Sequence, residues 1–344
     1  MDASVIVVNW RQPELTLRCL ESLVGQRASA SFEIVLVENE ASPGGTEPFR
    51  RLVPDLVVVE EATNAGFAGG VRRGIEASRG DVVVLLNNDA VAEPGFVEAG
   101  LAALRAGGPR VAAASATVTL EGGFVRATAR DEGALVDGRG TAWLRSSAPE
   151  AVGLLNGTGV ELAPDGNGRD RDWLRPSDDV VDHPADPFGF SGGAAFVRRT
   201  ALEAVGGFDE GLFMYYEDLD VSWRLRLAGL EIVHAASART IHRHAASSAG
   251  SGALVRRQSM RNRLLVVVRN GSAGFVARVT LRTLARLLID LARPRGAQLS
   301  RRDWGSVCRG LPSAVAGALV SRRRSGVTRG ERRRVEQSLR SIDH

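Results

Sequence analysis

Segments with the apolar pattern of strands alternate with segments of helical spacing over the first 106 residues of this 344-residue chain. This alternation limits the fold more than any other feature of the sequence. Strands are predicted over residues 4–9, 32–39, 56–60 and 81–89, and helices over 13–24, 67–80 and 94–106. The strand segments are apolar at nearly every position, as in strands that are buried on both faces. We therefore predict an α/β fold with a parallel sheet built from strand–helix–strand units.

The pattern becomes less regular after residue 110. A strand is predicted over 111–120, whereas the Gly, Asp, Arg and Pro content of 121–187 predicts hairpins and long loops. Strand character returns over 188–199, and 231–242 is predicted to be a strand followed by a loop. From Ser251 onward the chain is predicted to be mainly helical.

Charge separates the two ends of the chain, and we divide it into an α/β domain, residues 1–250, and a basic C-terminal region, residues 251–344. From Gly250 onward there are 21 arginines and 5 acidic residues, whereas the first 249 residues hold 23 arginines and 35 acidic residues. Such a basic region either packs against the acidic domain or contacts an anionic membrane. We favour packing, with membrane contact as a second role. No aromatic platform or recognition motif supports binding to nucleic acid.

One helix in the basic region has an amphipathic pattern. Its predicted apolar face consists of Phe275, Val276, Val279, Leu284, Leu287, Leu288 and Leu291. Arg278, Arg282 and Arg286 recur every four residues and are predicted to form another face. The basic end, residues 322–334, is expected to be partly disordered.

Cysteine usage and the N-terminus indicate the compartment. Cys19 and Cys308 lie far apart and form neither a disulfide framework nor a metal-binding pair. The chain begins without the basic flank of a signal peptide, and no apolar run is long enough for a transmembrane helix. We therefore expect a cytoplasmic protein, placed at the inner face of the membrane if its basic region binds lipid.

The segment from Phe213 to Val233 holds the strongest chemical signal. Glu217 and Asp218 open a predicted helix, and Gly229 is placed to end it. The apolar residues of that helix have four-residue spacing: Leu219, Trp223 and Leu227. Two carboxylates at a helix start are suited to proton transfer, although the alternative is a cap or a partner of the helix dipole.

Asn87, Asn88 and Asp89 close the strand predicted over residues 81–89. Ligands of open α/β sheets bind beyond the carboxyl ends of the strands, where Asp89 could hold Mg²⁺ or Mn²⁺ together with phosphate oxygens. The alternative is an ordinary polar turn. His242, near the end of another predicted strand, is a second candidate metal or phosphate ligand, although an isolated surface histidine often has no such role.

Two further segments resemble nucleotide-binding loops. Asn64, Gly66, Gly69 and Gly70 lie at the start of a predicted helix, where free amides suit phosphate. Close packing of helix on sheet explains the glycines equally well. Glu38 and Asn39 in VENEAS could hydrogen-bond a base or ribose, and the alternative is an ordinary turn.

The order of these segments resembles that of family-two glycosyltransferases with the GT-A fold, in particular the rhamnosyltransferase-like branch. The resemblance spans residues 3–250 and is carried by SVIVVNW, VENEAS, NAGFAGGVRRGI, VVVLLNNDA, FGFSGGAAFVRR, GGFDEGLFMYYEDLDVSWR and IHRHAASS. The resemblance implies that the chain forms the Rossmann-like sheet of nucleotide-diphospho-sugar transferases, followed by a C-terminal helical extension.

The resemblance also implies roles for individual residues. Donor-binding roles are implied for Asn9, Glu38, Asn64, Gly66, Arg72, Asn88, Gly192 and Gly193. It implies that Asp218 is the catalytic base with Glu217 beside it, and that Asp89 and His242 lie at the metal. Two positions depart from the family, which usually has Asp at the position of Glu38 and often Asn at that of Arg72. These departures concern the choice of donor more than the reaction.

The implied reaction is inverting, metal-dependent transfer of rhamnose or a similar sugar from a dTDP- or UDP-linked donor. The acceptor would be a hydroxyl of a glycan, a lipid-linked glycan or a metabolite, and the metal Mn²⁺ or Mg²⁺. A sugar nucleotidyltransferase and a non-catalytic nucleotide-sugar binding protein are the alternatives. The first would have a glycine-rich basic loop where this chain has VVNWRQPE, and a dehydrogenase would have GxGxxG there.

Overall fold

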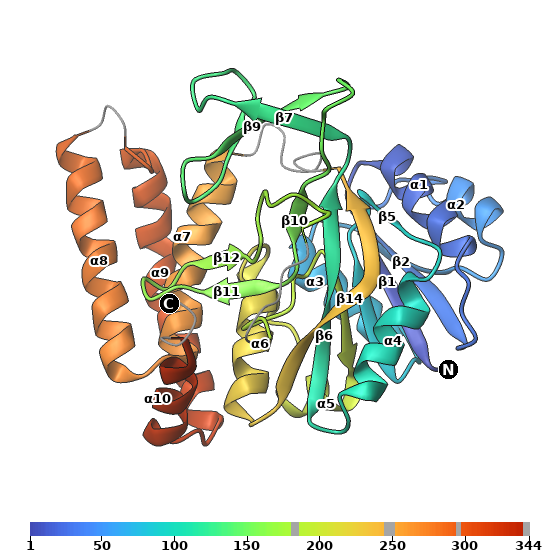
Figure 1. Cartoon of the computed structure of the whole chain (residues 1–344). Coiled ribbons are helices and arrows are strands. Elements are labelled where there is room, and N and C mark those ends of the chain that lie inside the picture. The colour runs from blue at the N-terminus through green and yellow to red at the C-terminus, as the bar shows by residue number, and fades with distance from the viewer. Residues whose placement is uncertain (180–185, 244–251, 294–296, 340–344) are drawn as a thin grey trace.

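The computed structural model describes residues 1–179, 186–243, 252–293 and 297–339. Among these, a nine-stranded sheet carries helices on both faces, and the C-terminal helices stand at one side of it (Figure 1). The elements of the central α/β part are β1 (Ala3–Asn9), α1 (Pro13–Val24), β2 (Phe32–Asn39), α2 (Glu47–Leu52), β3 (Val57–Glu61), α3 (Gly66–Ala77), β4 (Val82–Leu86), β5 (Ala90–Ala92), α4 (Phe96–Ala106), β6 (Val111–Leu120), β13 (Ala194–Arg198), α5 (Arg199–Ala204), the 3-10 helix η1 (Glu210–Leu212), α6 (Glu217–Leu227) and β14 (Glu231–His242).

The elements of the first 106 residues confirm the predicted alternation. Pro13 begins α1, where its fixed φ suits a helix and its missing N–H is not needed. α2 and β5 were not predicted, and β4 ends at Leu86, before the residues 87–89 that were predicted to close it. α3 ends at Ala77, so Gly80 does not close it. Gly80 instead lies against β1, where a Cβ atom would come within 2.3 Å of the carbonyl carbon of Ala3. Strand packing thus explains that glycine better than a helix cap.

The sheet is mixed, so the prediction of a parallel sheet was only partly correct. Its strand order is β3-β2-β1-β4-β13-β6-β14-β5, and β10 pairs with β6. The first four strands are parallel, as expected for strands joined by helices. β13 is antiparallel to both β4 and β6, because the chain enters it from the opposite end after a long excursion. β14 is a strand over its whole length, with an irregularity between Ala235 and Arg239, where a loop was predicted to follow the strand.

Side chains of the central strands alternate between two apolar cores. In β4, Val84 and Leu86 point to the core formed with α1 and α4, whereas Val83 and Leu85 point to the core formed with α3 and α6. This two-sided burial explains why the strands have continuous apolar sequences.

The excursion between β6 and β13 forms small antiparallel units, as predicted for 121–187 as far as that segment is described. They consist of β7 (Gly123–Ala127), β8 (Leu135–Val136), β9 (Ala142–Ser146), β10 (Leu155–Gly157), β11 (Val160–Leu162) and β12 (Gly168–Asp170). β7, β9 and β8 form a three-stranded sheet. β11 and β12 form a hairpin that lies between the large sheet and the C-terminal helices (Figure 1).

The C-terminal helices share a core with α6. They are α7 (Gly252–Asn270), α8 (Ala273–Ala292), α9 (Arg301–Arg324) and α10 (Arg329–Ser338). Trp223 of α6 is fully buried, and its ring stacks edge-on between Phe188 at 5.9 Å and Phe275 at 5.7 Å. This core crosses the proposed boundary at residues 250 and 251, which lies outside the described residues, so the two-domain division stays a prediction.

Two predictions for the basic region need correction. The apolar residues of α8 do not form one face, because Phe275 and Val279 are buried whereas Leu284, Leu288 and Leu291 are exposed. The basic end is helical where disorder was expected. Thr328 and Glu331 form a capping box at the start of α10, and the buried Arg332 donates to the carbonyl oxygens of Arg269 and Asn270 at the end of α7. Within the described residues, no helix combines the length and hydropathy needed to span a bilayer.

Candidate active site

Four polar side chains meet where β1 and β2 end and where the chain leaves β4. Asn9 donates to Glu38 Oε2 at 2.7 Å, and its own Oδ1 accepts from Thr16 Oγ1 at 2.8 Å. Asn88 Nδ2 donates to Asn9 Oδ1 at 3.2 Å and to Thr16 Oγ1 at 3.1 Å. Burial raises the pKa of Glu38, and the hydrogen bond from Asn9 opposes this. The sequence-predicted residues Asn9, Glu38 and Asn88 therefore share one network, as expected where parallel strands end at a common edge.

The loop before α3 forms a second network around Asn39. Asn39 Nδ2 donates to Asn64 Oδ1 and to the carbonyl oxygen of Gly66, both at 3.0 Å, and Asn39 Oδ1 accepts from the Ala65 amide at 2.9 Å. Asn64 Oδ1 also accepts from the amide of Gly66 at 2.8 Å. The amide of Gly66, which a phosphate site would use, thus has a partner within the protein.

Gly66 and Arg72 of α3 face different surroundings. Gly66 has a φ of +75°, and a Cβ atom there would lie 2.3 Å from the carbonyl oxygen of Phe213. This contact supports the close-packing explanation of that glycine. Arg72 forms ion pairs with Glu76 and Glu210, each at 3.0 Å. Arg72 is therefore paired with carboxylates of α3 and η1 in this structure. Its contact with the sugar-nucleotide donor stays a prediction.

Asp89 and His242 come together because β5, which follows Asp89, pairs with the end of β14. His242 lies opposite Ala90 in that pairing. His242 Nε2 lies 3.0 Å from Asp89 Oδ1, and its Nδ1 lies 2.9 Å from Asn156 Oδ1. Asp89 Oδ2 is buried and has no hydrogen-bond partner among the described residues.

This pair fits a divalent cation that is shared with a bound ligand. A carboxylate oxygen and an imidazole nitrogen both bind Mn²⁺, and the unpartnered Asp89 Oδ2 offers one more oxygen. In the described part of the chain, no group of three or more His, Cys, Asp and Glu side chains is arranged to hold a metal. Phosphate oxygens of a ligand would therefore have to complete the coordination.

The two acids of α6 differ in their surroundings. Asp218 Oδ2 accepts from the Gly192 amide at 2.8 Å, and Oδ1 accepts from the Leu219 amide at 2.7 Å. Burial raises the pKa of Asp218, and these two N–H donors oppose the rise. Glu217 is buried, its Oε2 has no hydrogen-bond partner among the described residues, and burial and then the charge of Asp218 raise its pKa well above the usual range. Burial thus disfavours the ionised form of both acids, most strongly that of Glu217, whereas the two amides favour the ionised form of Asp218.

The glycine pair before β13 connects Asp218 with the metal candidate. The carbonyl oxygen of Gly193 accepts from the Asn87 amide at 2.9 Å, because β13 pairs with β4. A Cβ atom on Gly192 would lie 3.4 Å from Asp218 Oδ2, an ordinary contact distance, so contact with this carboxylate does not by itself require glycine. The antiparallel β13 therefore brings Asp218 to the sheet edge that carries Asp89.

Asp170 is a candidate residue that the sequence did not reveal. It ends β12, and although its side chain reaches solvent, the surrounding protein raises its pKa to about 6. The charge of Asp218 adds to this rise, whereas His242 lowers it. Asp170 therefore interacts electrostatically with both the candidate base and the candidate metal ligand. Its only sequence signal was an acid in a segment predicted to be loops.

Two polar partners were also missed: Thr16 and Asn156. Thr16 lies on a predicted helix and Asn156 in a predicted loop, so neither position carried a signal. Asn39 in VENEAS was predicted together with Glu38 as a contact of a base or ribose, and the structure gives it hydrogen bonds to the loop before α3. The part of IHRHAASS after Arg243 lies outside the described residues.

Comparison with known proteins gives a family match. A family model described as "Glycosyl transferase family 2" matches residues 4–175. A curated relative from Mycobacterium tuberculosis, named N-acetylglucosaminyl-diphospho-decaprenol L-rhamnosyltransferase, is 29% identical over 228 residues. That alignment covers 63% of this chain and 68% of the relative.

Two solved structures share the fold. A structure of GalNAc-T7 with UDP, GalNAc and Mn²⁺ has a TM-score of 0.57 at 13% identity, and the match covers 91% of this chain but 57% of that one. The mannosyltransferase PcManGT from Pyrobaculum calidifontis, in complex with GDP-Man and Mn²⁺, has a TM-score of 0.51 at 16% identity. That match covers 98% of this chain and 84% of the mannosyltransferase.

Proposed function

Since the chain belongs to glycosyl transferase family 2, we propose that it is an inverting glycosyltransferase that moves rhamnose or a similar sugar from a nucleotide-diphosphate donor to an acceptor hydroxyl. The mixed sheet followed by α7–α10, and the fold shared with the two transferase structures, confirm the predicted GT-A fold. The position of Asp218 carries the proposal. It is bound to the Gly192 amide at the same sheet edge as Asn88 and Asp89.

In the proposed reaction, Asp218 accepts the proton of the acceptor hydroxyl while that oxygen forms a bond to the anomeric carbon. The bond between the anomeric carbon and the diphosphate oxygen breaks, and the nucleoside diphosphate leaves with the electron pair from the opposite face. The configuration of the sugar is therefore inverted. Assistance by a general base is worth about 10²–10⁴-fold in rate. Glu217, kept neutral by burial, would not compete for this proton.

The donor would lie along the carboxyl ends of β1, β2 and β4. We propose that the network of Asn9, Glu38 and Asn88, with Asn64 on the next loop, holds the nucleoside. The sugar would lie over the Gly192–Gly193 pair, beside the side chains of Asp218 and Phe67. The proposed donors are dTDP- and UDP-linked sugars, with Gly66 and Arg72 as further predicted contacts.

The proposed cofactor is Mn²⁺ or Mg²⁺, held by Asp89 and His242. When bound, such an ion supplies positive charge that stabilises the departing diphosphate. Asn156 would orient the imidazole through its contact with His242 Nδ1, as partners of metal-binding histidines commonly do.

For the acceptor we propose a lipid-linked glycan first, because the mycobacterial relative is named for a diphospho-decaprenol acceptor. A glycan without lipid and a small metabolite are the alternatives. A lipid-linked acceptor would place this protein at the inner face of the cytoplasmic membrane.

The outer face of α8 supports such a membrane contact. Its exposed leucines recur with helical spacing, and Leu281, Leu284 and Leu288 are 66%, 50% and 66% exposed. Arg282 is exposed beside them, whereas Asp290, the one acidic residue of α8, is buried and accepts from Arg286. An apolar stripe beside exposed arginine, without exposed carboxylates on the same helix, is suited to the surface of an anionic bilayer. α8 is also the outermost of the C-terminal helices in Figure 1.

Asp218→Asn tests the proposed reaction. In a transfer assay with dTDP-rhamnose and UDP-sugars, we expect the variant to lose about 10²–10⁴-fold in kcat while it still binds nucleotide diphosphate. A variant with wild-type turnover would disprove the role of Asp218. Formation of a nucleotide sugar and pyrophosphate from a sugar phosphate and a nucleoside triphosphate would instead identify a nucleotidyltransferase. A wild-type protein that binds donor without any turnover would be a binding protein.

A further inference from the structure

The turn that leads into α6 has an unfavourable backbone conformation. Phe213 has φ 63° and ψ −66°, and the Met214 amide donates to the carbonyl oxygen of Leu212 at 2.7 Å, so these residues form a γ-turn of the rare positive-φ kind. Tyr215 and Tyr216 follow with φ values of 66° and 72°. Residues other than glycine rarely adopt such values, and a run of them requires support from the surrounding structure. Glu217 and Asp218 follow this turn directly.

Asn262 of α7 provides much of this support. Its side-chain amide is fully buried, and Nδ2 donates to the carbonyl oxygens of Leu212 at 2.7 Å, Met214 at 2.9 Å and Tyr215 at 2.8 Å. An amide has two N–H donors, so one of them is shared between two carbonyl groups. One side chain of the C-terminal region thus holds three carbonyl groups of the turn.

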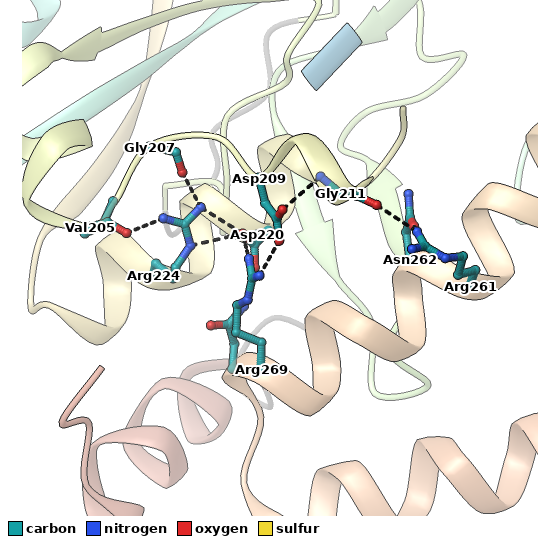
Figure 2. A network of polar contacts seen from close by, with 10 residues as sticks. Val205, Gly207, Asp209, Gly211, Asp220, Arg224, Arg261, Asn262 and Arg269 are labelled. Atoms are coloured by element: carbon teal, nitrogen blue, oxygen red, sulfur yellow. Dashed lines mark hydrogen bonds and ion pairs between the residues drawn. The ribbon is translucent and has the colours of Figure 1, made fainter. Parts of the chain in front are cut away.

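The carbonyl groups of Gly211, which precedes the turn, and of Phe213 within it have partners on other elements. Arg261 Nη1 donates to the carbonyl oxygen of Gly211 at 2.9 Å and to Asn262 Oδ1 at 2.8 Å, so it also orients the amide (Figure 2). On the other side, the amide of Ala68 in α3 donates to the carbonyl oxygen of Phe213 at 3.0 Å. The turn is therefore held between α3 and α7.

A second contact joins α7 to the helix that carries the two acids. The fully buried Asp220 of α6 accepts from Arg269 Nη1 at 2.8 Å and from Arg224 within its own helix (Figure 2). It also accepts from Asn270 Nδ2 at 2.8 Å. This group fastens α7 to α6. Among the described residues, its side chains give no hydrogen bond to the carbonyl groups of Leu212, Phe213 and Met214; the contact of Asp220 with Tyr216 is the backbone bond at the start of α6. Asn270 therefore contributes to the docking of α7 on α6, whereas Asn262 supports the turn. Substituting them one at a time tests the two roles separately.

We propose that Asn262 is a positioning residue for glycosyl transfer, which holds the turn at Leu212–Tyr216 in the conformation that presents Asp218 to the acceptor. The inference rests on the proposed transferase function. It makes α7 a part of the catalytic machinery, although Asn262 is 44 positions from Asp218 in the sequence. A small displacement of a catalytic group is enough to reduce turnover strongly without affecting binding of the donor.

Asn262→Ala tests the inference, and Asn270→Ala is a matched control. Both asparagines are buried on α7, and each donates to a group close to the start of α6. For Asn262→Ala we expect kcat to fall by about 10²-fold with little change in the KM for the sugar nucleotide. Asn262→Ser, which keeps one hydroxyl donor, should lie between Asn262→Ala and the wild type. Asn270→Ala should keep a kcat close to that of the wild type, even if its unfolding temperature drops as much as that of Asn262→Ala.

Hydrogen exchange of the peptide amides of Phe213 and Met214, measured by mass spectrometry, gives a readout without turnover. We expect faster exchange in Asn262→Ala than in the wild type and unchanged exchange in Asn270→Ala. Equal kcat in the two variants, or unchanged exchange in Asn262→Ala, would overturn the inference. If Asn262→Ala does not fold, Asn262→Ser and Asn270→Ser replace the pair in the same comparison. An inactive wild type with a protected turn would refute the proposed function while leaving the support of the turn established.

Discussion

Gly66→Ala allows the contact between α3 and the turn before α6 to be measured. Gly66 has a φ of +75°, and an added Cβ atom would lie 2.3 Å from the carbonyl oxygen of Phe213 and 2.6 Å from its Cδ2. The backbone of Phe213 cannot move away freely, because its carbonyl oxygen accepts from the Ala68 amide at 3.0 Å. The substitution therefore combines two costs, a left-handed conformation and an overlap with backbone.

Two other glycines separate these costs. Gly44 has a φ of +71°, and a Cβ atom there would have no neighbour within 4 Å among the described residues, so Gly44→Ala measures the conformational cost alone. At Gly138 φ is ordinary and the space is again open within the described part of the chain. We expect a loss in the free energy of unfolding of about 1–2 kcal/mol for Gly44→Ala, and a change within about 0.5 kcal/mol for Gly138→Ala. For Gly66→Ala the overlap adds about 1–3 kcal/mol, which gives about 2–5 kcal/mol in total.

Equilibrium unfolding in urea, followed by the fluorescence of the five tryptophans, gives these free energies from the midpoint and slope. The turnover of Gly66→Ala should also fall, since the turn that it displaces leads to Asp218. A loss in Gly66→Ala no larger than that in Gly44→Ala would refute the proposed overlap. A large loss of unfolding free energy in Gly138→Ala would show that the comparison does not separate the conformational cost from the overlap.

Three more outcomes are expected. The pKa of Asp290 is lowered to about 2, so its stabilising contribution is complete above pH 4 and is lost as the pH falls through 2. Asp290→Asn should therefore lower the free energy of unfolding in urea by about 2 kcal/mol at pH 7, and by progressively less below pH 4. The pKa of Asp170 is raised to about 6 from 3.8, so its ionisation destabilises the fold as the pH rises through 6; Asp170→Asn should raise Tm at pH 8 but not at pH 4. In flotation with anionic vesicles, Leu284→Glu combined with Leu288→Glu should reduce binding at least about tenfold, whereas Val24→Glu, at an exposed site on α1, should not. Unchanged flotation, or a change from dimer to monomer instead, would refute membrane contact through α8.

Local sequence pattern predicted most elements of the sheet but not the direction of every strand. The bounds of β2 and β6 were predicted correctly, because each is a mainly apolar segment, FEIVLVEN and VAAASATVTL, bounded by polar or turn-forming residues. β13 has an equally apolar sequence, AAFVR, yet it runs antiparallel. Direction depends on where the preceding excursion returns the chain, and an apolar run contains no information about this.

In α8, helical spacing identified the helix but not the face that is buried. The helix has apolar residues on two sides, Phe275 and Val279 on one and Leu284 and Leu288 on the other. Periodicity detects both sides and does not say which one meets α7. Only the tertiary packing around Trp223 decides it, by placing Phe275 against that ring.

Some residues of the candidate site were predicted from the sequence and others were not. Asp89 and Asp218 were found because each adjoins a regular element whose end can be read from the sequence. Asp170 and Asn262 were not found, because their roles depend on contacts with distant segments. An asparagine between two arginines, directly before the apolar run 264–268, is the one signal that Asn262 carried. Such a side chain must satisfy its amide somewhere, and here its partners are backbone carbonyl groups.

The surroundings of Asp218 connect the strained turn with its proposed basicity. Its position in the first turn of α6 favours the ionised form through the helix dipole, as expected from the sequence, and the amides of Gly192 and Leu219 act in the same direction. Burial acts against them and raises the pKa, which brings a carboxylate closer to the proton affinity that a base needs at neutral pH. That burial exists because the turn holds the start of α6 inside the protein. Releasing the turn should therefore lower the pKa of Asp218 and weaken it as a base, besides displacing it.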